Sequence, residues 1–189
     1  MLTQEQQKRI MEIYHRNGNV SNEVQVLNNI SPKKLKNAIN SYAHQFNKAN
    51  DSAVCLFDDT VFGSAKNGFL LTTRGLYFRN MSENANGAEL NIIDRFALKE
   101  NLLVHKLQVI TTFGSVLEIE VTQMESTKRR ALIAFVNEAL EVLRVNGTRT
   151  NVTTANAVPQ AQIPTNCINC GAVIMNGTNV CEYCGSIYS

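Results

Sequence analysis

The sequence lacks any uninterrupted run of about 18 apolar residues, the length that a helix needs to cross a bilayer. Its first residues, MLTQEQQKRIMEIYHRNGN, are polar with scattered apolar side chains, which does not match a secretory leader. We therefore expect a cytoplasmic protein. The sequence also lacks a large charge excess, because a formal net charge of +2 is too small to indicate a nucleic-acid or membrane partner by itself.

Residues in the pattern of a catalytic centre are also missing. The three histidines, His15, His44 and His105, lie in separate segments without a Ser or Cys placed to act as a nucleophile. No pair of carboxylates is spaced for acid–base work, and Cys55 within AVCLF is typical of a buried apolar position. We therefore expect that the protein is not an enzyme.

What is present is the composition of a soluble globular protein. Of the 189 residues, 44% are hydrophobic and 18% are charged. This length accommodates one ordinary domain together with a small one.

Residues 1–49 have the periodicity of short helices. A first helix is expected over about Gln4–Arg16, because apolar residues share one stripe and Asn17-Gly18 follows as a stop signal. A short helical segment is expected from Ser21. A third helix should begin with Ser31 as N-cap and Pro32 at its first position. Its apolar stripe comprises Leu35, Ala38, Ile39, Tyr42 and Phe46.

From Ala53 onward the apolar period changes to two, which predicts antiparallel strands. The strand-like runs are AVCLF, GFLLTT, GLYFRN, ELNII, LLVHKLQVITT and SVLEIEVTQ. In the last run Glu118 and Glu120 alternate with apolar residues, so one face of this strand should be exposed to solvent and the other buried. A final amphipathic helix should begin at Ser126 or Thr127 and end at about Arg144. Strands followed by one long helix predict an α+β fold.

Residues 146–165 have no sustained periodicity and are rich in Thr, Asn, Ala and Pro, which predicts a flexible linker. The predicted organisation is therefore a helical N-terminal segment over 1–49, a β-rich domain over 50–145, this linker, and a cysteine-rich module over 166–189.

Four of the five cysteines form two C-x-x-C pairs in that last module. A structural zinc ion takes four soft ligands in a tetrahedron, and each C-x-x-C turn brings two sulfurs to one ion. Roughly twenty residues cannot bury a core large enough to fold alone, so metal binding would supply the folding free energy. Two disulfides, an iron site or a redox dithiol fit less well. The sequence predicts one structural Zn²⁺ held by Cys167, Cys170, Cys181 and Cys184.

This predicted zinc site leaves no position for catalysis, because four thiolates complete the coordination of the ion. Four thiolates and one Zn²⁺ would also bring the formal net charge from +2 to about zero. The ribbon would then present a surface, on which Tyr183 and Tyr188 are candidates for partner contact or serve only to cover the ribbon.

The segment from Gly63 to Gly68 opens like a phosphate-binding loop but is not followed by the Lys and hydroxyl residue that such a loop needs. The sequence around it, FDDTVFGSAKNGFLLTTRGLYF, resembles bacterial pleckstrin-homology-like (PH-like, GRAM-related) domains. The resemblance covers about residues 50–145 and implies a bent antiparallel β-barrel or sandwich closed by a C-terminal helix. It also implies a scaffold that binds lipids, peptides or proteins, although fold alone does not fix function.

Basic residues could contact an anionic partner in three places: the start of the third helix, the first hairpin of the β-rich domain, and the start of the last helix. These candidates are Lys33, Lys34, Lys36, Lys66, Arg74, Arg79, Lys128, Arg129 and Arg130. They equally suit an ordinary solvated face. The segment before Ser31 would also permit a helix-turn-helix interpretation, whereas Asp58 and Asp59 would oppose an anionic ligand and are expected to be turn residues.

The leading hypothesis is a non-catalytic adaptor that binds a protein partner through the PH-like domain and the zinc ribbon. Two alternatives remain open at this point: a nucleic-acid-associated zinc-ribbon protein, and a peripheral protein that binds anionic lipid through the PH-like domain. No small-molecule substrate is indicated.

Overall fold

The computed structural model describes residues 1–17, 20, 23–100 and 105–144. The predicted linker and the predicted zinc ribbon, including Tyr183, Tyr188 and the four clustered cysteines, lie outside the described residues. None of the described helices combines the length and the apolar character of a membrane-spanning segment.

The described chain forms an α+β fold with helices at both ends and antiparallel strands between them. The elements are α1 (Gln4–Arg16), β1 (Val24–Val26), α2 (Pro32–Ser41), β2 (Ala53–Asp58), β3 (Gly68–Thr72), β4 (Gly75–Arg79), β5 (Asn86–Glu89), β6 (Ile93–Glu100), β7 (His105–Thr111), β8 (Val116–Glu120) and α3 (Ser126–Arg144). Two short 3₁₀ turns, Leu27–Asn29 and Leu90–Ile92, precede α2 and β6.

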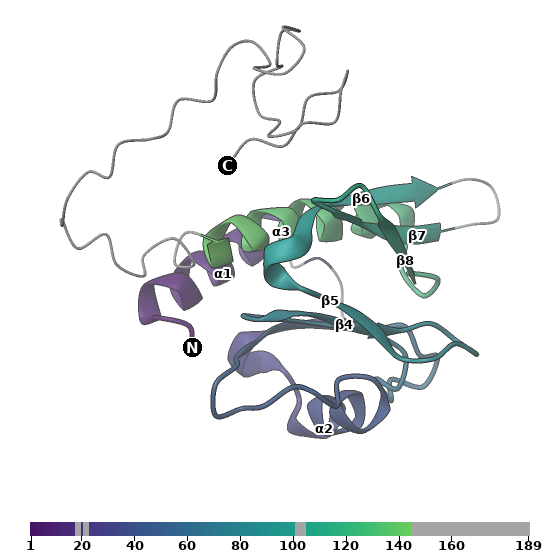
Figure 1. Cartoon of the computed structure of the whole chain (residues 1–189), viewed down its shortest axis with the longest axis horizontal. Coiled ribbons are helices and arrows are strands. Elements are labelled where there is room, and N and C mark those ends of the chain that lie inside the picture. Colours follow the sequence, from purple (N-terminus) through teal and green to yellow (C-terminus); the bar gives the residue numbers. More distant parts are fainter. Residues whose placement is uncertain (18–19, 21–22, 101–104, 145–189) are drawn as a thin grey trace, which may run out of the picture. The chain divides into compact units, whose positions relative to one another are not determined.

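The strands form two sheets, one of five strands in the order β1-β2-β3-β4-β5 and one of three in the order β6-β7-β8. In Figure 1 the helix α2 lies on one face of the five-stranded sheet, α3 lies against the three-stranded sheet, and α1 packs beside α3. The main core fills the space among both sheets, α1 and α3. A second, smaller core lies between α2 and the outer face of the five-stranded sheet. The two faces of that sheet are therefore both largely covered.

The first and last helices follow the sequence signals closely. Thr3 caps α1 in a capping box, in which its hydroxyl accepts from the Gln6 N–H at 3.2 Å and its own N–H donates to the Gln6 side chain at 2.9 Å. The apolar stripe of α1 faces α3, where the Tyr14 and Phe135 rings meet edge to face at 5.5 Å. The predicted bounds of both helices are confirmed.

The helix expected from Ser21 is wrong, because Val24–Val26 forms the strand β1. β1 pairs with β2, so that Val24 lies opposite Phe57 and Val26 opposite Cys55. Both valines are buried, and β-branched residues at alternate positions suit a strand that gains a partner. A strand before Ser31 also removes the helix-turn-helix interpretation, which needs a helix there.

Two further predictions need correction. The α2 helix ends at Ser41, so Tyr42 and Phe46 join the small core from the segment that follows the helix. ELNII is not one strand, because β5 ends at Glu89 and β6 starts at Ile93 after a 3₁₀ turn. The strand β6 was not predicted; its alternation is weak because charged residues interrupt it.

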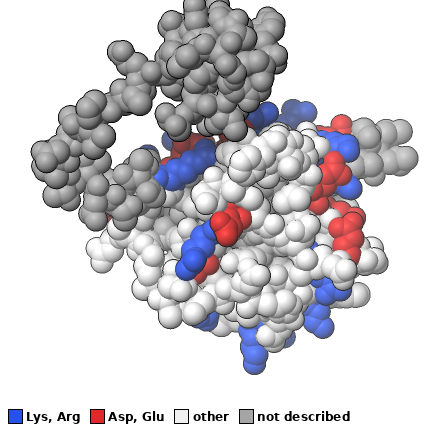
Figure 2. Space-filling view, viewed as in Figure 1, with Lys and Arg blue, Asp and Glu red and all other residues white. Residues whose placement is uncertain are grey.

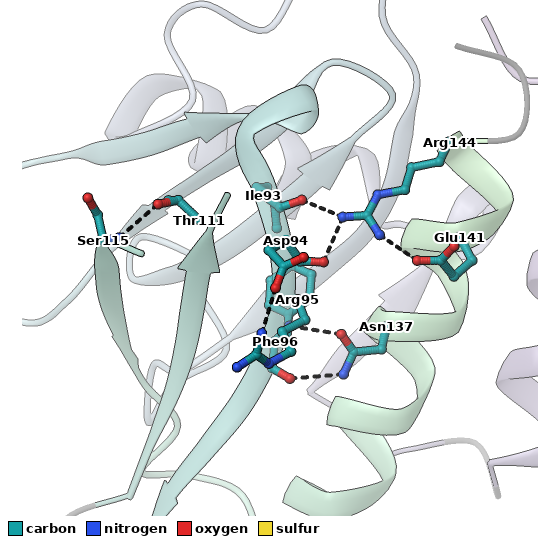
Figure 3. A network of polar contacts seen from close by, with 9 residues as sticks. All are labelled: Ile93, Asp94, Arg95, Phe96, Thr111, Ser115, Asn137, Glu141 and Arg144. Atoms are coloured by element: carbon teal, nitrogen blue, oxygen red, sulfur yellow. Dashed lines mark hydrogen bonds and ion pairs between the residues drawn. The ribbon is translucent and has the colours of Figure 1, made fainter. Parts of the chain in front are cut away.

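The β6 strand is instead fixed by side chains of α3 (Figure 3). The Asn137 amide accepts from the Phe96 N–H at 2.8 Å and donates to the Phe96 carbonyl at 2.9 Å. The Arg144 guanidinium donates to the carbonyls of Ile93 and Asp94 at 2.5 and 2.6 Å. α3 thus satisfies the outer edge of β6 in the way that another strand would.

Candidate functional site

The loop between β2 and β3 is held against α2 by three polar contacts. The Lys34 ammonium lies 2.8 Å from the Asp58 carboxylate, at the end of β2. Further along the helix, the Asn37 amide donates to the Ser64 carbonyl at 2.8 Å and the Ser41 hydroxyl donates to the Lys66 carbonyl at 2.7 Å. The segment that resembles a phosphate-binding loop is therefore docked on a helix face through its own carbonyls.

Asp58 was predicted to be a turn residue but is the last residue of β2, paired with Gly68, and it is almost fully buried. Burial alone would raise the pKa of its carboxyl, but hydrogen bonds from Lys34 and Thr60 outweigh burial and lower that pKa. The Thr60 N–H donates to Asp58 at 3.0 Å, which starts the turn. Because Lys34 compensates this buried charge, its ammonium is committed within the fold.

Asp59 also has a structural role at the base of the loop. Its carboxylate accepts from the Gln123 N–H at 3.0 Å and from the Thr122 hydroxyl at 2.9 Å, which joins the loop to the segment before α3. Burial raises the pKa of Asp59 to about 6. Both acidic side chains thus hold the loop between β2 and β3 in place.

The tip of this loop is apolar and exposed. Val61 and Phe62 are 74% and 95% accessible. Three exposed lysines belong to the same loop or to the helix that holds it: Lys66 in the loop, and Lys33 and Lys36 in α2. Two apolar side chains in solvent, on a loop that contains one of these lysines and lies on the helix that carries the other two, can enter an interface.

The other predicted basic contacts do not form one continuous surface. Arg79 is half-buried and donates to the Ser41 hydroxyl and the Glu83 carbonyl at 3.1 and 3.0 Å. Arg129 is 6% exposed, and its guanidinium pairs with Glu100. Arg130 is exposed, and Lys128 is partly buried. In Figure 2 positive and negative side chains are interspersed on the visible face, which is mostly uncharged.

A cleft lies where β4 and β5 meet the segment that follows α2. Two adjoining cavities of about 860 and 400 Å³ share the lining residues Gln45, Arg74, Tyr77 and Glu89. We call the two cavities together the Arg74–Tyr77 cleft. The larger cavity extends to the end of α3, and the smaller one follows β5.

Two glycines create the floor of this cleft. Gly75 lies opposite Glu89, and Gly87 lies opposite Tyr77. A Cβ on Gly75 would come within 2.5 Å of the Ala88 carbonyl oxygen, and one on Gly87 within 2.6 Å of the Leu76 carbonyl oxygen. The close approach of the two strands therefore requires glycine at both positions, and Gly87 is exposed beside the Tyr77 ring.

The chemistry of the cleft suits binding. The Arg74 side chain is exposed and has no hydrogen bond or ion pair with another described residue. Burial raises the pKa of the half-buried Tyr77, with a further contribution from Asp51, so its hydroxyl is a proton donor at neutral pH. Amide side chains complete much of the remaining lining: Gln45, Asn47, Asn50 and Asn91.

Of the cleft residues, the sequence singled out Arg74 and missed Tyr77, Gln45 and Glu89. These residues come from separate segments, and a local pattern does not relate them. The available signal was the pair of strand glycines, because glycine within a strand marks a close backbone approach.

Within the described part of the chain, no cluster of His, Cys, Asp and Glu could hold a metal ion. The four clustered cysteines lie outside that part, so the zinc prediction stays a prediction. No protein-family model matches the chain, and no curated protein shows significant similarity to it.

Proposed function

We propose that the chain is a non-catalytic binding protein that holds a segment of a protein partner in the Arg74–Tyr77 cleft. The observation that carries this proposal is the cleft itself, which combines a guanidinium without a partner among the described residues, a phenol and several amides. Such a lining recognises carboxylates, backbone amides and flat apolar groups. Arg and Tyr are also the residue types that most often dominate the affinity of protein interfaces.

The PH-like interpretation belongs to this proposal. A four-strand meander (β2 to β5), a three-strand meander (β6 to β8) and a C-terminal helix follow the order that the sequence resemblance implies. β1 extends the first sheet by one strand from the N-terminal segment. We assign the scaffold role to this domain and a second, zinc-dependent contact to the ribbon formed by Cys167, Cys170, Cys181 and Cys184.

Selection of binders from a displayed random-peptide library on the full chain tests the cleft. Selected peptides should bind the wild type, and Arg74→Ala and Tyr77→Ala should each weaken binding about tenfold or more in calorimetric titrations. Arg9→Ala removes an exposed arginine from α1 and serves as the matched control, with unchanged affinity expected. Equal affinity of all three variants for every selected peptide would show that the cleft is not the binding site.

A second candidate function is favoured by the exposed Val61–Phe62 tip and its lysines. A peripheral protein could insert these apolar side chains into an anionic membrane while Lys33, Lys36 and Lys66 meet the headgroups. The full chain should then pellet with vesicles containing phosphatidylserine, and Phe62→Ser should release it. Failure of the wild type to pellet at low salt would dispose of this function.

For a nucleic-acid partner the described residues offer less support. Lys34 and Arg129, two of the predicted contacts, are already paired with Asp58 and Glu100. Affinity for DNA or RNA that falls steeply with added salt would still support this third function, and absence of binding at low salt would remove it.

A further inference from the structure

The five-stranded sheet ends at β5, and the described residues do not cover the outer edge of that strand. The two sheets differ in how their outer edges are covered. α3 occupies the outer edge of β6 with Asn137 and Arg144 (Figure 3). None of the described residues covers β5 in this way, and the smaller cavity of the Arg74–Tyr77 cleft runs along its whole length. An uncovered strand edge beside a cleft is the arrangement in which peptides add to sheets.

The register identifies the groups that β5 presents outward. The Leu90 N–H donates to the Arg74 carbonyl at 2.8 Å, and Ala88 lies opposite Leu76. Backbone groups in an antiparallel pair alternate between facing the partner and facing away. Since residues 88 and 90 face β4, the backbone groups of Gly87 and Glu89 point out of the sheet.

Two of these outward groups match one residue of an added strand. The Gly87 N–H already donates to the Asn86 side chain at 2.8 Å, which leaves the Gly87 carbonyl and the N–H and carbonyl of Glu89. In a parallel pair, one residue donates to the carbonyl before its opposite residue and accepts from the N–H after it. The Gly87 carbonyl and the Glu89 N–H stand in that relation on either side of Ala88.

We propose that an extended, acidic segment of a partner protein adds to the outer edge of β5 as a parallel strand. This inference rests on the proposed function and adds the mode of binding and the chemistry of the partner. One residue of the segment pairs with the Gly87 carbonyl and the Glu89 N–H. The larger cavity is lined by Arg74 and Glu89 and by Arg144, which is already paired with Glu141, so a carboxylate on the segment has Arg74 as its partner.

The variant Glu89→Pro tests the backbone bond directly. Glu89 has φ of −67°, the angle that proline adopts, and its N–H points away from β4, so proline removes the donor and leaves the sheet ladder intact. Glu89→Gln is the matched control, because it keeps the N–H and removes the same charge. Peptides selected on the full chain should bind Glu89→Pro about tenfold or more weakly than Glu89→Gln, whatever effect the lost charge has in both variants.

Methylating the backbone nitrogens of a selected peptide, one at a time, supplies a test that does not alter the protein. One methylated position, the donor to the Gly87 carbonyl, should abolish most of the binding to the wild-type chain, and its neighbours on either side should bind normally. This measurement decides the question if Glu89→Pro fails to fold. Uniform tolerance of methylation would overturn strand addition.

The outcomes separate the two proposals. If Arg74→Ala weakens binding while Glu89→Pro and backbone methylation do not, the cleft binds side chains only and strand addition is wrong. If Arg74→Ala and Tyr77→Ala have no effect, the proposed function itself fails. Light scattering tests whether a second copy of the chain, instead of a partner segment, pairs at β5. A wild-type dimer that becomes a monomer in Glu89→Pro would show such pairing and would contradict the peptide proposal.

Discussion

Replacing Asn137 by alanine removes the side chain through which α3 satisfies the edge of β6. Asn137 makes two hydrogen bonds to Phe96, at 2.8 and 2.9 Å, and Phe96 is 3% exposed. A net hydrogen bond contributes about 1 kcal/mol, and a buried group left without a partner costs about 1–3 kcal/mol. We therefore expect Asn137→Ala to lower the free energy of unfolding by about 2–3 kcal/mol. For a chain of this size that loss corresponds to a fall in Tm of about 4–12 °C.

Urea denaturation followed by circular dichroism measures this loss on the full chain. Asn137→Asp is the matched control, because its carboxylate still accepts from the Phe96 N–H but cannot donate to the Phe96 carbonyl, and it should lose about half as much stability. Light scattering should also show more self-association of Asn137→Ala at high concentration, since an uncovered strand edge pairs with other chains. A change in unfolding free energy below about 0.5 kcal/mol for Asn137→Ala would refute the role assigned to this side chain.

Three further predictions concern the metal and the two acidic turn residues. Cys170→Ser should abolish zinc binding, because a structural site needs four ligands, and elemental analysis should find one zinc per wild-type chain; metal-free wild type would overturn the assignment. Asp59→Asn should raise the unfolding free energy by about 1 kcal/mol near pH 7, because a pKa of about 6 in the folded state means that stability is lost as the pH rises through that value. Denaturation at about pH 4 should show no such gain, and an equal gain at both pH values would exclude this explanation. Lys34→Met should cost about 2 kcal/mol near neutral pH by leaving Asp58 without its cation. That cost should shrink as the pH falls below about 4, because the lowered pKa of Asp58 stabilises the folded chain only above the pKa of the unfolded carboxyl. A difference in denaturation midpoint between wild type and Lys34→Met that is the same at about pH 7 and below about pH 4 would contradict this role of Lys34.

The parts of the fold that the sequence predicted well are those with local signals. Caps and apolar stripes lie within a few residues of each other, so α1 and α3 were placed with their observed bounds. β1 and β6 depend on partners distant in the chain. Val24 and Val26 become a strand because Phe57 and Cys55 lie opposite them, and Phe96 is held by Asn137. Such pairings leave little trace in a local pattern.

The candidate site shows the same division. A basic residue can be recognised from the sequence, but whether its charge can contact a partner depends on the residues that surround it in the fold. Arg129 belongs to a basic run and yet is buried, because Glu100 and the carbonyl of Met124 receive its guanidinium. Arg74 remains exposed because glycines and amides surround it. Tyr77 lies three residues further along the chain, but Gln45 and Glu89 join these two only in the fold, so the cleft could not be predicted from spacing.

The pairing of α1 with α3 has a consequence for the synthesis of the chain. The Gln6 amide donates to the Val142 carbonyl at 3.2 Å, and the Ile10 side chain is fully buried in the core that α3 completes. A growing chain emerges from the ribosome N-terminus first, so the apolar stripe of α1 has no cover until α3 has been made. During that interval the stripe is exposed to chaperones and to other nascent chains. A chain that stalls before residue 126 would therefore expose this stripe, and we expect it to aggregate or be degraded.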